Sequence, residues 1–115
     1  MRQRASIRTK KRLTLKFGTS DLSRTGVTND LSMDGLKIQA NTQYKPGTLL
    51  HIELHVTTAI VLRLSGMVRW AKRCPPALVS VMQPGMGVQL DRASQDYERY
   101  VKVMEALLGG KTSKG

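Results

Sequence analysis

The chain has 115 residues, one cysteine and a formal net charge of +11, from 19 Lys and Arg against 8 Asp and Glu. A single cysteine excludes an intramolecular disulfide, and no apolar run approaches the roughly 18 residues of a membrane-spanning helix. We therefore expect one cytoplasmic domain with no membrane insertion.

Residues 1–11 are predicted to form a flexible, extended and strongly basic arm. Seven cationic side chains precede the first acidic residue, Asp21: Arg2, Arg4, Arg8, Lys10, Lys11, Arg12 and Lys16. An arm this basic attracts an anion, which could be a phosphate ester, a nucleic acid or an acidic lipid. A solvated, disordered tail explains the composition equally well, and composition alone does not choose between the two interpretations.

Alternation of apolar and polar residues predicts a series of short strands after the arm. Leu13, Leu15 and Phe17 define the first strand. Pro46-Gly47 marks a turn, and Gly66 is a candidate site for a β-bulge. The remaining strands are predicted at residues 25–29, 36–40, 49–56, 60–72, 77–82 and 85–90.

The last part of the chain changes to helical spacing. Tyr97, Val101, Met104 and Leu108 form one apolar stripe, Ser94 is the expected N-cap, and Gly109-Gly110 end the helix. Six or seven strands and one terminal helix predict an all-β fold with a C-terminal helix, either a barrel or a sandwich, over residues 12–108. Residues 109–115 are predicted to be a disordered tail.

Signals for catalysis and for metal binding are weak. His51 and His55 stand four residues apart on one predicted strand, which separates them by about 13 Å, too far to share a metal ion. Cys74 has no histidine near it in the sequence, and the chain contains neither a G-x-x-x-x-G-K-[ST] loop nor an H-E-x-x-H motif. We expect no enzyme activity and no cofactor.

Two short motifs fit the recognition of a phosphorylated purine. Arg4 and Arg8 form an R-x-x-x-R pair, and guanidinium groups bind phosphate bidentately, stack on purines and recognise the O6/N7 edge of guanine. Asp30, Ser32 and Gly35 form a D-x-S-x-x-G turn. Asp30 could accept from the guanine N1–H and N2–H₂ groups, Ser32 could donate to a ligand or to a backbone oxygen, and Gly35 is expected to supply a positive φ. Each motif alone is also what a basic tail or an ordinary turn contains.

The two motifs together resemble the PilZ domain family. The strand with Gly66-Met67-Val68-Arg69-Trp70, the closing strand at residues 85–90 and the terminal helix extend this resemblance over about residues 2–108. It implies a six- or seven-stranded antiparallel PilZ-like β-barrel that binds cyclic di-GMP as a ligand and performs no catalysis. The ligand-binding residues implied by position are Arg4, Arg8, Asp30, Ser32 and Gly35, with secondary contacts at Arg2 and Arg69. Arg4 and Arg8 fit better than Arg8 and Arg12 because Arg8 keeps the family's spacing to Phe17.

The function implied by this resemblance is a receptor or adaptor. Cyclic di-GMP would order the arm onto the barrel, and the changed surface would regulate an unidentified effector protein. One alternative is a basic barrel that binds nucleic acid without sequence preference. Such barrels usually display aromatic stacking platforms, whereas we expect Phe17 and Trp70 to be buried. The other alternative is a protein-interaction adaptor that does not use the nucleotide.

Overall fold

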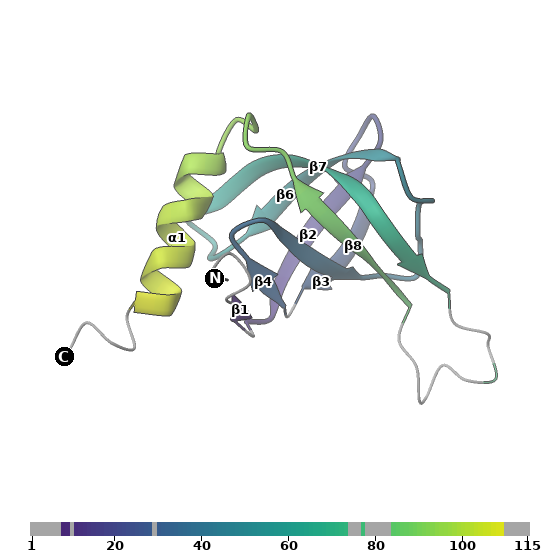
Figure 1. The fold of residues 1–115 in the computed structure, drawn as a ribbon, viewed down its shortest axis with the longest axis horizontal. Coiled ribbons are helices and arrows are strands. Elements are labelled where there is room, and N and C mark those ends of the chain that lie inside the picture. The colour runs from purple at the N-terminus through teal and green to yellow at the C-terminus, as the bar shows by residue number, and fades with distance from the viewer. Residues whose placement is uncertain (1–7, 10, 29, 74–76, 78–83, 110–115) are drawn as a thin grey trace, which may run out of the picture.

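The computed structural model describes residues 8–9, 11–28, 30–73, 77 and 84–109, and within these ranges the chain is built mainly of strands (Figure 1). The elements are β1 (Arg8–Thr9), β2 (Leu13–Gly18), β3 (Arg24–Thr28), β4 (Leu31–Ser32), β5 (Gly35–Gln39), β6 (Leu49–His55), β7 (Val61–Lys72), β8 (Gly85–Leu90) and α1 (Tyr97–Gly109). Most of the predicted arm, the predicted strand at 77–82 apart from Ala77, and the tail beyond Gly109 lie outside the described residues. In the described ranges, no helix is long and apolar enough to cross a bilayer.

The strands close into an antiparallel barrel, which confirms the predicted fold class. The order β5-β3-β2-β6-β7-β8 returns to its start because β8 also pairs with β5. The two-residue strands β4 and β1 continue the sheet beyond β5, and Figure 1 shows them at the end of the barrel nearest to α1. This arrangement brings β1, β4 and the C-terminal helix to one end of the described structure.

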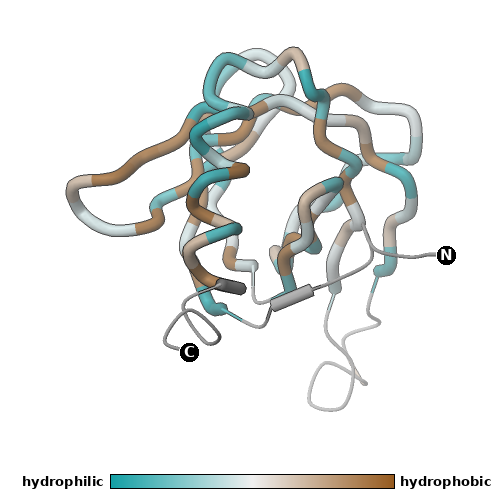
Figure 2. Tube along the Cα trace, turned by 60° about the vertical axis from the view of Figure 1, so that its left-hand side comes forward, coloured by the Kyte–Doolittle hydropathy of each residue, from teal (hydrophilic) through white to brown (hydrophobic). Residues whose placement is uncertain are grey.

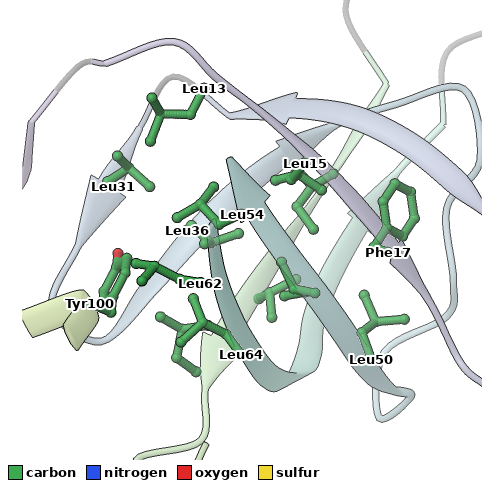
Figure 3. Close-up of a cluster of buried hydrophobic side chains, with 14 of the residues drawn as sticks. Leu13, Leu15, Phe17, Leu31, Leu36, Leu50, Leu54, Leu62, Leu64 and Tyr100 are labelled. Carbon is green, nitrogen blue, oxygen red and sulfur yellow. The ribbon is translucent and has the colours of Figure 1, made fainter. Parts of the chain in front are cut away.

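Alternate side chains of the strands are buried in the barrel interior. Figure 2 shows the hydropathy of each residue along the chain trace. Phe17 is fully buried, as predicted, and Figure 3 shows it in the same cluster as Leu15 and Leu50. Tyr100 and Met104 extend this cluster from α1, so the helix closes one end of the core. Burial of each large apolar side chain contributes roughly 1.5–3 kcal/mol, and the core therefore holds the helix against the barrel.

A β-bulge in β7 changes which side chains face the solvent. Val68 pairs with Val88, but Trp70 pairs with Gly87, so Arg69 is an additional residue on β7. The bulge was expected at Gly66, where the pairing is regular, and this prediction is wrong. Because one inserted residue reverses the alternation, Trp70 points outward with 43 % of its surface exposed. The predicted burial of Trp70 is therefore also wrong.

Two further local predictions have different outcomes. The turn at Pro46-Gly47 is confirmed, since Gly47 has a φ of 93°. The N-cap at Ser94 is wrong, because α1 begins at Tyr97 and its first turn carries a hydrogen bond from the Tyr100 N–H to the Asp96 carbonyl. The Ser94 hydroxyl instead contacts β7, where it accepts a hydrogen bond from the Ser65 N–H at 2.9 Å.

Candidate functional site

The segment between β4 and β5 forms a closed turn around the Ser32 side chain. The Ser32 hydroxyl accepts a hydrogen bond from the Gly35 N–H and donates one to the Gly35 carbonyl, both at 3.2 Å. The Asp30 carbonyl accepts from the Lys37 N–H at 3.2 Å and from the Thr28 hydroxyl at 3.3 Å. The Ser32 hydroxyl therefore holds the shape of the turn, which was one of the two roles expected for it.

Gly35 is needed for a reason other than the predicted one. Among the described glycines, the positive φ belongs to Gly47, so Gly35 does not supply a left-handed conformation. Gly35 instead lies where β5 meets β8, in register with Gln89. A Cβ at this position would overlap the Val88 carbonyl oxygen. The glycine thus allows the two closing strands of the barrel to approach each other directly beneath the turn.

A surface pocket of about 220 Å³ opens beside this turn. Four of the sequence-predicted residues line it: Asp30, Ser32, Gly35 and Arg69. The last of these is placed there by the bulge in β7. Lys37 adds a second cationic side chain to the lining, and Asp30 and Asp34 contribute two carboxylates, so the pocket offers both cations for an anionic group and acceptors for hydrogen-bond donors.

The end of the basic arm lies next to the same turn. In the β1–β4 ladder, Arg8 is paired with Ser32 and Thr9 with Leu31. The backbone of the second arginine of the R-x-x-x-R motif is thereby fixed at the edge of the D-x-S-x-x-G turn. Arg2 and Arg4 lie outside the described residues.

Trp70 is a pocket residue that the sequence reasoning missed. Its indole ring covers Gly87 so closely that a Cβ on that residue would overlap the ring. The Lys37 ammonium group lies 5.9 Å from the centre of the indole, at cation–π distance. The exposed ring forms an apolar wall against which a planar base could stack. The pairing of Trp70 with Gly87 could have predicted this contact, because glycine leaves room for the ring. That pairing can be recognised only once the register between β7 and β8 is known.

Helix α1 holds the turn from the side of the core. The Tyr100 hydroxyl donates a hydrogen bond of 2.6 Å to the Ser32 carbonyl, and the Tyr97 hydroxyl donates one of 3.0 Å to the Met33 carbonyl. Burial, with a smaller contribution from neighbouring Tyr97, raises the pKa of Tyr100 above its ordinary value. Tyr100 therefore remains a neutral donor at physiological pH.

The histidines do not form a metal centre. His55 Nε2 lies 3.0 Å from Glu53 Oε1, whereas His51 lines a different part of the surface. Within the described part of the chain, no group of three His, Cys, Asp or Glu side chains is placed to hold a metal ion.

Comparison with known proteins identifies the family and supports the fold. The family model described as PilZ domain matches residues 2–104. The Bacillus subtilis inhibitor of motility (MotI/DgrA) has a similar fold, with a TM-score of 0.65 and 11 % identity over 87 % of this chain and 47 % of that chain. This chain thus spans about half the length of that protein. The PilZ domain of CeSA from a cellulose-synthesizing bacterium gives a TM-score of 0.57 and 20 % identity, over 92 % of this chain and 99 % of that chain. A comparison with curated proteins found no match.

Proposed function

The chain belongs to the PilZ domain family, whose members are generally cyclic di-GMP receptors, and we propose that it is a cytoplasmic receptor for this dinucleotide. The observation that carries the proposal is the pocket beside the β4–β5 turn. Asp30, Ser32, Gly35 and Arg69 line it, and the backbone of Arg8 is paired with that of Ser32. This proximity supports a ligand site that uses residues of both motifs.

The residues in and beside the pocket would contact different parts of a cyclic guanine dinucleotide. Arg8, together with Arg4 from the arm, would bind the phosphates through bidentate guanidinium contacts. Asp30 would accept from the N1–H and N2–H₂ groups of a guanine, while Trp70 would provide a surface for stacking. Arg69 adds positive charge next to the indole.

Binding would also order the basic arm. An arm that carries so many cations repels itself, and a dianionic ligand would supply charge-assisted contacts that offset the conformational entropy lost on docking. PilZ domains act as binding or adaptor domains rather than as enzymes. We therefore propose that the regulated activity belongs to an effector protein, which recognises the barrel when the arm is docked on it.

Calorimetric titration with cyclic di-GMP tests the proposal, and cyclic di-AMP is the matched control because it keeps the phosphates and changes the bases. We expect saturable binding of the guanine compound, much weaker binding of the adenine compound, and shifted amide NMR signals from the arm. A chain that binds neither compound would overturn the proposal.

Nucleic acid binding is the second candidate function. The sequence argued against it because Trp70 was expected to be buried and unable to stack on a base, but Trp70 is exposed. Among the exposed large hydrophobic residues of the described chain, however, Trp70 is the one aromatic, alongside Leu49 and Met67. Single-strand binders stack successive bases on several rings. Steeply salt-dependent binding of a random oligonucleotide, without any response to cyclic di-GMP, would favour this alternative.

A further inference from the structure

We infer that helix α1 sets the geometry of the nucleotide-binding turn through the hydroxyl groups of Tyr100 and Tyr97, so that ligand binding and helix docking are coupled. This inference rests on the proposed function, since it concerns the same turn. It adds two positioning residues that lie far from the motifs in sequence. It also identifies α1 as the element through which occupancy of the pocket is transmitted.

The first support is the contact between Tyr100 and Ser32. Tyr100 is only 1 % exposed, and its hydroxyl donates to the main-chain carbonyl of Ser32 in a buried environment. The hydroxyl of the same serine closes the turn onto Gly35, and its backbone is in register with Arg8. One residue thus joins the arm, the turn and the helix. A shift of the phenol would leave a buried carbonyl without its donor, which is costly.

The second support is that neighbouring residues of the turn are held from the same side. Tyr97 donates to the Met33 carbonyl, and Arg92, just before the helix, forms an ion pair of 3.1 Å with Asp34. Three consecutive turn residues are therefore attached to the segment that contains the start of α1. Two of these three residues, Ser32 and Asp34, also line the pocket.

The coupling is reciprocal by thermodynamic necessity. If docked α1 favours the turn geometry that binds the nucleotide, then bound nucleotide favours docked α1 to the same extent. Tyr100 and Met104 anchor the helix in the core, so the change expected on binding is a gain in protection rather than a large displacement. An effector that contacts α1 would thereby sense whether the pocket is filled.

The test compares the Tyr97→Phe/Tyr100→Phe double variant with Met104→Leu. The double variant removes both hydroxyls and keeps both rings, whereas Met104→Leu perturbs a fully buried residue of the same helix that does not donate to the turn. The first measurement is the Kd for cyclic di-GMP. The second is hydrogen exchange of the α1 amides with and without the nucleotide, and thermal melting reports the loss of stability in each variant.

We expect the double variant to bind about tenfold more weakly and to lose the ligand-induced protection of α1, while Met104→Leu keeps both despite a comparable loss of stability. Wild-type affinity and protection in the double variant would overturn the inference and leave the proposed function intact. Failure of the wild-type chain to bind would overturn the proposed function itself. Should the double variant not fold, Tyr97→Phe alone carries the test, because that ring is only half-buried.

Discussion

Arg8 lies directly across the β1–β4 ladder from Ser32. The end of the R-x-x-x-R arm and the D-x-S-x-x-G turn are therefore joined through main-chain pairing. A ligand held between them would contact two chain segments that are separated in sequence by the whole of the first hairpin. The predictions below test each part of this arrangement.

Replacing the arginine pair should abolish binding without unfolding the barrel. In Arg4→Ala/Arg8→Ala the phosphates lose their bidentate partners, whereas the core is unchanged because it is formed by β2 to β8 and α1. We expect no calorimetric binding and a change in melting temperature of no more than about two degrees. The control Lys11→Ala/Arg12→Ala removes the same charge and should bind within a few-fold of wild type. Equal losses in both variants would show that only net charge matters.

Asp30→Asn should lower the preference for guanine over adenine. The carboxylate can accept from both donors on the guanine edge, while an amide replaces one acceptor with a competing donor. We expect at least tenfold weaker binding of cyclic di-GMP and little change for cyclic di-AMP. Asp21→Asn, which removes the same charge away from this pocket, should have no effect. Unchanged selectivity in Asp30→Asn would remove Asp30 from the site.

Trp70 should report binding by its own fluorescence, since it is the single tryptophan of the chain. A base stacked on the indole is expected to quench the emission in a saturable manner. Trp70→Ala should weaken binding by about 1–3 kcal/mol, the range typical of base–aromatic stacking, and Trp70→Phe should retain part of that energy. Binding that is equally tight in Trp70→Ala would place the bases elsewhere.

Gly35→Ala should destabilise the barrel. The added methyl group would press on the Val88 carbonyl and force β5 and β8 apart, at a cost of about 1–3 kcal/mol in the free energy of unfolding. Urea titration measures this loss. Gly47→Ala is the informative comparison, because a Cβ there meets nothing within 4 Å and any loss of stability would come from its φ of +93° rather than from a clash. Wild-type stability in Gly35→Ala would contradict the close approach.

The raised pKa of Tyr100 predicts that the protein loses folding stability at alkaline pH. The buried phenol keeps its proton above the ordinary tyrosine value of about 10, while the unfolded chain ionises there. Its contribution to stability is therefore complete below about pH 10 and is lost as the pH rises toward the folded-state pKa. Between pH 9 and 11 the melting temperature of Tyr100→Phe should fall less than that of wild type. Parallel decreases would show that the hydroxyl does not contribute.

The positions of the longer strands were predictable because a barrel wall has a buried face and an exposed face, so apolar and polar residues alternate along each strand. Leu13, Leu15 and Phe17 face inward as this alternation indicates. The bulge was not predictable, since the residues around Arg69 alternate as a regular strand would and only the pairing with β8 reveals the additional residue. The outward position of Trp70 and the role of Gly35 follow from strand pairing, which no local pattern encodes. The bonds from Tyr97 and Tyr100 join segments far apart in the chain, and the helical stripe predicts only that these rings face the core.

The pairing of β5 with β8 also has a consequence during synthesis of the protein. Gly35 and Leu36 of β5 and Gly87 and Gln89 of β8 line the pocket side by side, on paired strands. These strands are distant in sequence, and distant pairings form late because the intervening chain must first be ordered. While β8 is still inside the ribosome, the nascent chain therefore lacks the β8 residues that line the pocket. Under the proposed function, cyclic di-GMP would therefore bind only the completed barrel and would slow its reopening rather than assist the early steps of folding.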